Sequence, residues 1–127
     1  MNAERFDDAY APDGAITLRH LQIHDEMGDS VRCLATLTVD HRDLHLETSA
    51  HGTIGAVSEM LYGLGFGVEI VGLYHQTDGA EVTAYLQCTR DGERCWSYGR
   101  AANGDEATVH ALIAAANQLT GRLPAAC

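Results

Sequence analysis

Basic side chains are scarce in this chain of 127 residues, which carries 8 Lys and Arg against 18 Asp and Glu, a formal net charge of −10 at pH 7. Because that charge opposes nucleic acid phosphates and anionic membrane surfaces, we expect neither as a partner. Long apolar runs are also missing, and none approaches the roughly 20 residues that span a bilayer. The segment Met1–Gly14 is acidic, whereas a secretory signal peptide is basic and then apolar. The sequence therefore predicts a cytoplasmic protein.

Closely spaced cysteine pairs are absent as well. The four cysteines (Cys33, Cys88, Cys95 and Cys127) form no C-x-x-C pair. This spacing indicates neither a zinc knuckle nor the disulfide framework of a small secreted protein. Cys33 and Cys88 fall in strand-like alternation, where a free cysteine packs as a small apolar residue. We therefore expect reduced thiols, no metal site and no cofactor.

What the chain does have is the composition of one packed domain. Hydrophobic residues make up 46% of the chain and charged residues 20%. This balance is typical of globular proteins and not of disordered ones. A chain of this size buries roughly two-thirds of its unfolded surface. One core can therefore form without a metal or disulfide staple.

The first half of the chain has the pattern of three strands followed by a helix. The predicted strands are Ile16–His24, Val31–Asp40 and Leu44–Ser49, with a turn at residues 41–43. The apolar parity of the first strand shifts near Arg19 and His20, which predicts a β-bulge there. Apolar residues at three- and four-residue spacing over Gly52–Leu64 predict a helix, with Thr53 available as its N-cap. Glycines at positions 63, 65 and 67 end this helix.

The second half repeats this order. The predicted strands are Val68–Gln76, Glu81–Thr89 and Arg94–Arg100, with turns at residues 77–79 and 90–93. The continuous apolar run of the first of these strands predicts burial on both faces. A last helix begins at Asn103, Gly104 and Asp105 and is closed by Gly121. Its predicted buried stripe is Val109, Leu112, Ile113, Ala116 and Leu119.

The two halves align about 51 residues apart, with Ala56 on Ala107 and Leu61 on Leu112. This register predicts an α+β protein made of two βββα repeats, about 15–66 and about 67–121, which form one duplicated domain over 15–121. Residues 1–14 are then a lead-in segment and residues 122–127 a tail. One helix covers only one face of a sheet, so each half needs a second layer, either the other half or another chain. We therefore expect a homodimer formed through the duplicated elements.

Four strings of this sequence, taken in order, resemble one known family. Trp96-Ser97-Tyr98-Gly99 looks like a W-G-V-G strand, and Ala107–Asn117 (ATVHALIAAAN) looks like an A-S-L-x-A-L-x-S-A-x-N helix without a gap. Leu64–Ile70 (LGFGVEI) is similar to the stretch between the first helix and the fourth strand, and Phe6–Tyr10 (FDDAY) to the segment leading in. From about Glu4 to Leu119, the chain thus resembles the C-terminal regulatory, or dimerisation, domain of 2-isopropylmalate synthase and citramalate synthase.

This resemblance implies a regulatory module and not a synthase. In the family, the domain follows a catalytic barrel, pairs with its copy, and binds leucine or a similar product near the dimer interface to switch off synthesis. A chain of 127 residues cannot hold that barrel. We therefore expect a stand-alone dimeric module with no catalysis of its own, which binds a small carboxylate or amino-acid-like effector and acts on a separate synthase.

Two pocket segments depart from the family. Where the family has G-N-G-P-x-D-A at the start of the first helix, this chain reads Ala50-His51-Gly52-Thr53-Ile54-Gly55-Ala56. The family's D-Y-x-x-H after the fourth strand becomes Gly72-Leu73-Tyr74-His75-Gln76. His51 thus replaces an asparagine and Leu73 a tyrosine, which changes both a polar contact and the wall of the pocket. We expect leucine to bind weakly or not at all, and another amino or keto acid to be preferred.

The best candidate site is the start of the first helix at His51, Gly52, Thr53 and Ile54. Free backbone N–H groups and the positive end of a helix favour a carboxylate there, and glycine lets it approach. The alternative is that Gly52 only makes the turn and Thr53 only caps the helix. The predicted apolar wall, which fits a plain core equally well, is Ile70, Leu73, Val82 and Ala84.

Histidines offer two further possibilities. His20 with His24, and His41 with His45, have the four-residue spacing that binds metal on a helix, but on a strand such residues lie roughly 13 Å apart. We therefore expect them on a solvated sheet face. If the chain is instead a small enzyme, such as an isomerase, cyclase or hydrolase, its general acid or base is expected among His51, His75 and Tyr74. A third alternative is a protein that only dimerises or docks.

Overall fold

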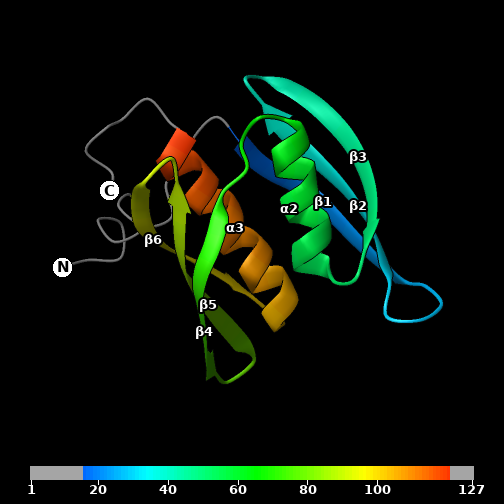
Figure 1. Ribbon diagram of the computed structural model, residues 1–127. Coiled ribbons are helices and arrows are strands. Elements are labelled where there is room, and N and C mark those ends of the chain that lie inside the picture. The colour runs from blue at the N-terminus through cyan, green and yellow to red at the C-terminus, as the bar shows by residue number, and fades with distance from the viewer. Residues whose placement is uncertain (1–15, 121–127) are drawn as a thin grey trace.

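A computed structural model describes residues 16–120 of the chain (Figure 1). The fold is α+β, with two three-stranded antiparallel sheets and two helices in an order compatible with a βββα repeat. The first half contains β1 (Ile16–Asp25), β2 (Val31–Val39), β3 (Arg42–Ala50) and α2 (Thr53–Gly63). The second half contains β4 (Glu69–Asp78), β5 (Glu81–Arg90), β6 (Glu93–Ala101) and α3 (Gly104–Thr120). The Phe6–Tyr10 string, Gly121 and Cys127 lie outside the described residues.

The two sheets share an irregularity at the same place. The pairing of β1 with β2 shifts between Leu18 and His20, which confirms the predicted bulge. The pairing of β4 with β5 shifts between Ile70 and Gly72, where no parity shift is visible in the sequence because residues 70–74 form a continuous apolar run. Both first strands are therefore bent at matching positions of the repeat.

The hairpin turns are tighter than predicted in the first half. The turn between β2 and β3 is formed by Asp40 (φ 49°) and His41 (φ 69°), not by residues 41–43, and β3 begins already at Arg42. In the second half, Asp91 (φ 52°) and Gly92 (φ 83°) take the same positive φ values. Two central residues with φ above zero suit the right-handed twist of the flanking strands. His41 hid this turn from the sequence, because only glycine adopts such a φ freely.

The helices lie side by side between the two sheets (Figure 1). α2 packs on β2, β3 and α3, whereas α3 packs on β5, β6, α2 and β1. Each half is thus the second layer of the other. As a result, α3 is buried almost all round, well beyond the predicted stripe, since residues 107–109 and 111–118 are all buried. The core formed there includes Leu37, Leu61, Leu86 and Leu112, each with no exposed surface.

Strand β4 is the main departure from the expected burial. Its apolar run predicted a strand covered on both faces, but residues 73–78 are all exposed, as is Val71. The physical reason is its position at the edge of its sheet, because α3 lies over β5 and β6. The prediction of a doubly buried strand is therefore wrong.

Small residues allow β6 and α3 to approach closely. A Cβ atom added to Gly99 would lie 2.5 Å from the carbonyl oxygen of Ala107 and from the amide nitrogen of Ala111. Ser97, on the same face of β6, donates its hydroxyl to the Ala111 carbonyl at 2.7 Å. The segments Trp96–Gly99 and Ala107–Asn117 therefore pack directly against each other.

Candidate functional site

The start of α2 leaves its backbone donors without a side-chain cap. Gly52 is the N-cap residue, with extended backbone (φ 177°) and no side-chain hydrogen bond to the helix. The first turn contains no acidic residue, and a Cβ atom added to Gly52 would meet nothing within 4 Å. The first helical bond runs from Ala56 N–H to the Gly52 carbonyl, so the N–H groups of Thr53, Ile54 and Gly55 have no partner within the helix. The prediction that Thr53 caps α2 is wrong.

The start of α3, in contrast, has a side-chain cap and acidic residues of its own. The side-chain oxygen of Asn103 accepts a hydrogen bond from Glu106 N–H at 2.8 Å, which is an N-cap contact. Asp105 and Glu106 add negative charge to the first turn, where it offsets the positive end of the helix. The 51-residue register aligns Gly52 with Asn103, so the two copies differ at the position that decides whether the helix start is capped.

Thr53 joins the two helix starts instead of capping one. Its buried hydroxyl donates to Asp105 Oδ2 at 3.3 Å, which brings a carboxylate of α3 beside the uncapped end of α2. Burial raises the pKa of the Cys33 thiol nearby, the Thr53 hydroxyl opposes that shift, and the Asp105 charge adds to it. Cys33 is therefore held as a neutral thiol. Asp105 was not predicted as a site residue, because its place depends on how the two repeats dock.

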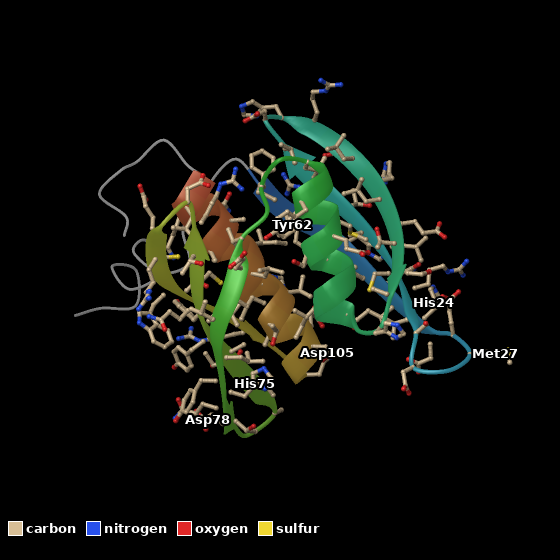
Figure 2. All side chains as sticks on the ribbon, in the orientation of Figure 1. His24, Met27, Tyr62, His75, Asp78 and Asp105 are labelled. Carbon is tan, nitrogen blue, oxygen red and sulfur yellow. The ribbon has the colours of Figure 1, made fainter. Side chains whose placement is uncertain are left out.

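His75 reaches the start of α3 from the sheet. Its Nε2 lies 2.8 Å from Thr108 Oγ1, and the Thr108 hydroxyl donates to the Gly104 carbonyl at 2.7 Å. Since that hydroxyl proton is already used, His75 must donate from Nε2, which leaves Nδ1 as an acceptor when the ring is neutral. A Cβ atom on Gly104 would lie 3.1 Å from Cε1 of His75, so glycine makes room for the ring. Figure 2 shows His75 and Asp105 at the end of the molecule where α3 begins.

The other predicted site residues divide into two groups. His51 is exposed beside Gly52, Ile54 is half-buried, and Leu73 is 48% exposed two residues before His75 on the same face of the sheet. Ile70 and Val82 are half-buried and pack against the core, while Ala84 is wholly buried in it. Tyr74 lies on the opposite face, because neighbouring strand residues alternate, and its ring contacts Tyr85 at 5.9 Å. Tyr74 therefore lies on the face of the sheet away from His75, whereas Ala84 pairs with His75 across β4 and β5 but has no exposed surface.

Two hollows lie away from this group. One, of about 590 Å³, lies beyond the opposite end of α2, and its Arg90 guanidinium donates to the carbonyls of Gly65 and Gly67. Because backbone acceptors and Asp91 engage this arginine, it is poorly placed to hold an anion. The other hollow, of about 240 Å³, lies on the outer face of β1–β3, where Thr36 shares a 3.0 Å hydrogen bond with His45 Nδ1.

The four histidines expected on a solvated sheet face are exposed in the structure. His20 and His24 pair with Thr36 and Arg32 on the outer face of the first sheet, and both are exposed, as are His41 and His45. Within residues 16–120, no group of three or more His, Cys, Asp or Glu side chains is arranged to hold a metal ion. No helix in the described part of the chain has both the length and the apolar character needed to cross a membrane.

A comparison of the whole chain with models of known protein families finds no match.

Proposed function

We propose that this chain is a module of the 2-isopropylmalate synthase regulatory-domain type, which forms a homodimer, binds a small carboxylate effector and modulates a synthase. The observation that carries the proposal is the uncapped start of α2. Three backbone N–H groups there lack a helical partner, and a Cβ atom added to Gly52 would meet nothing within 4 Å. In the second repeat, Asn103 and two acidic residues satisfy the equivalent helix end. A bound carboxylate would give the first turn of α2 the hydrogen-bond acceptor and negative charge that Asn103, Asp105 and Glu106 give to α3.

The charge beside this helix end favours an α-amino acid over a keto or hydroxy acid. A carboxylate at the N–H groups of α2 would lie close to Asp105, whose side chain meets Thr53 at 3.3 Å. An α-ammonium group offsets the repulsion between the two carboxylates, whereas a 2-oxo group does not. The apolar tail would then point toward Leu73 and Val82. Leucine itself is not the expected ligand, since His51 and Leu73 replace residues of the family pocket.

A thermal-shift screen of amino acids, 2-oxo acids and 2-hydroxy acids tests this proposal. A ligand at 100 times its dissociation constant adds about 2.7 kcal/mol to the free energy of unfolding. Gly52→Asp places a carboxylate at the same N–H groups, where the open space accommodates it, so the shift should disappear while the fold persists. Gly63→Asp adds the same charge in open space at the other end of α2 and should keep the shift. No shift with any acid, or an equal shift in Gly52→Asp, contradicts the proposal.

One observation favours a small enzyme as the second candidate. Thr108 fixes His75 with its proton on Nε2 near the start of α3, the helix that also carries Asp105, so Nδ1 is the ring nitrogen left to accept a proton. In that case a metabolite that produces a shift would also be converted, and His75→Gln would abolish conversion while retaining the shift. His51→Ala tests the other histidine of the site in the same assay. Binding without conversion favours the regulatory module, and neither binding nor conversion favours a protein that only docks.

A further inference from the structure

We infer that the outer face of the β4–β5–β6 sheet docks a proline-rich segment of a partner protein in the polyproline II conformation. This face points away from α3, which packs on the other side of β5 and β6 (Figure 1). It is therefore separate from the helix starts of the proposed effector site, and the inference does not depend on the identity of the effector.

Four aromatic side chains gather on this face. The chain contains five Tyr, two Phe and one Trp, so half of its aromatic residues lie here. The strand register places Tyr74, Tyr85 and Tyr98 in one row across the three strands, and Trp96 in the next row. Tyr74 is 63% exposed, Trp96 50%, and Tyr85 is half-buried. Tyr98 is buried, with the Arg100 guanidinium 4.9 Å from its ring centre, so the other three rings are the ones that a partner contacts.

The first repeat has no aromatic residue at the matched positions. Its strand register places Gln22, Leu34 and Glu47 in the row that corresponds to the three tyrosines, and His45 at the position of Trp96. Both sheets have the same strand order and the same antiparallel pairing, so the fold does not require rings on an outer face. Exposed Trp and Tyr side chains are instead typical of surfaces that bind a partner.

The inclination of the rings favours a groove over a flat platform. The ring centres of Tyr74 and Tyr85 lie 5.9 Å apart and their planes are inclined by 52°, while the planes of Tyr85 and Tyr98 are inclined by 34°. A nucleobase stacks on the flat face of a ring, and the net charge of −10 opposes its phosphates. Aromatic-lined grooves are the surfaces on which proline-rich segments dock.

The spacing of the strands matches the polyproline II repeat. That helix has about three residues per turn and rises about 3.1 Å per residue, so equivalent residues recur at about 9.3 Å. Neighbouring strands lie about 4.8 Å apart, which puts β4 and β6 about 9.6 Å apart. A polyproline II helix that lies across the strands therefore places every third residue above β4 or β6, the strands that carry the exposed rings of Tyr74 and Trp96.

The polar groups between the rings suit a backbone that accepts hydrogen bonds but does not donate them. Proline has a carbonyl group and no N–H, whereas phenol, indole and amide groups all donate. The Tyr85 hydroxyl donates to Gln76 Oε1 at 3.5 Å, which leaves the Gln76 amide nitrogen as a donor. The rows of Tyr85 and Gln87 contain no Asp, Glu, Lys or Arg. A neutral segment therefore meets no like charge in the centre of this face, although the chain as a whole is acidic.

The test is a fluorescence titration, because Trp96 is the single tryptophan of the chain. A blocked oligoproline peptide of about ten residues should change the Trp96 emission in a saturable way, whereas a flexible Gly-Ser peptide of equal length should not. Tyr74→Gln and Tyr85→Leu give the groove the residues of the first repeat, and each should weaken the oligoproline affinity by at least about tenfold. Gln22→Ala, at the position in β1 that matches Tyr74, should leave the affinity unchanged.

Three outcomes overturn the inference: no saturable change with the oligoproline, an equal change with the Gly-Ser peptide, or an unchanged affinity in both groove variants. Cellohexaose and an oligothymidylate of similar length are titrated in parallel. Binding of either one in place of the oligoproline also overturns the inference, because it assigns the rings to a sugar or to single-stranded nucleic acid. None of these probes is a small carboxylate effector, so the result is independent of the thermal-shift screen.

Discussion

Position 99 needs glycine because the backbone of α3 passes close to it, and not because of the backbone conformation of Gly99 itself. A Cβ atom there would lie 2.5 Å from two backbone atoms of α3, and neither can move without moving the helix. We expect Gly99→Ala to lower the free energy of unfolding by about 3 kcal/mol, the upper part of the usual range for overpacking. Denaturant unfolding measures this directly.

Gly67 provides the matched comparison for this prediction. A Cβ atom at Gly67 would lie 2.3 Å from the ring of Tyr62, but that side chain is 56% exposed and can rotate into solvent. Gly67→Ala should therefore cost less than about 1 kcal/mol. Equal costs at the two positions would show that the contact with the α3 backbone is not the reason for Gly99.

Cys88 links stability to alkaline pH. Burial raises the pKa of its thiol from the ordinary value of 9.0 to about 12. Below that lower value both states hold the proton, and above it only the folded state does. The free energy of unfolding should therefore fall between about pH 9 and 12, by up to about 1.4 kcal/mol per pH unit from this residue.

The measurement is the difference between the wild type and Cys88→Ala, since other groups also titrate at high pH. The variant should be less stable near neutral pH, because it leaves a cavity, and should lose less stability as the pH rises. Parallel pH profiles for the two proteins would refute the assignment.

At the scale of elements, the two hairpin turns allow a reciprocal test. Asp40 and His41 adopt the positive φ values that Asp91 and Gly92 adopt in the second half. His41→Gly should raise the free energy of unfolding by about 0.5 to 1 kcal/mol. A strain of about 1 to 2 kcal/mol is relieved, while glycine adds about 0.5 to 1 kcal/mol of unfolded-state entropy.

The reverse substitution, Gly92→His, should lower stability by a similar amount. Denaturant curves of the two variants measure both effects. Changes of the same sign at the two turns would contradict this interpretation of the turns.

Most elements of this fold were predictable because their signals are local. Alternation located the strands, three- and four-residue spacing located the helices, and the parity shift located the bulge in β1. The exposure of β4 was not predictable in this way, since an apolar run has the same sequence pattern in a central strand as in an edge strand. Which strands α3 covers is set by tertiary packing within the second repeat, where α3 lies over β5 and β6.

In the candidate site, too, the features with a local sequence signal were predictable and those set by contacts between distant elements were not. The helix start at Gly52 and Thr53 follows from local pattern, and the structure has α2 beginning there. The Asp105 carboxylate, the Thr108 hydroxyl and the orientation of His75 are set by contacts between elements more than 30 residues apart in sequence. The repeat register signals only that the two helix starts, at Gly52 and Asn103, are equivalent positions.

At the scale of the whole molecule, the duplicated halves have unequal roles. α3 is enclosed by its own sheet, by α2 and by β1, whereas one side of α2 stays exposed. The second helix is therefore the centre of the core, and the first sheet reaches it mainly through α2 and β1. The contact between β1 and α3 joins the sheet of the first repeat directly to the helix of the second.

Asn117 makes that connection through both edges of its amide. Its Oδ1 accepts from Ile16 N–H at 3.0 Å, and its Nδ2 donates to the Ile16 carbonyl at 2.9 Å, across 101 residues of sequence. Ile16 is only 2% exposed, so Asn117→Ala would leave two buried backbone groups without these partners. Each such group costs about 1 to 3 kcal/mol. We expect a loss of about 3 kcal/mol in the free energy of unfolding.

This prediction also says which part of the protein Asn117→Ala should destabilise first. Hydrogen exchange should accelerate first in β1, while β5 and β6 keep their protection, because the removed bonds hold one strand of the first repeat to a helix of the second. Gln118→Ala is the control: its amide donates to the Trp96 carbonyl at 2.9 Å within the second repeat. That variant should leave exchange in β1 unchanged. If Asn117→Ala instead weakened protection evenly across both sheets, the two halves would unfold as one unit, and Asn117 would be an ordinary core contact.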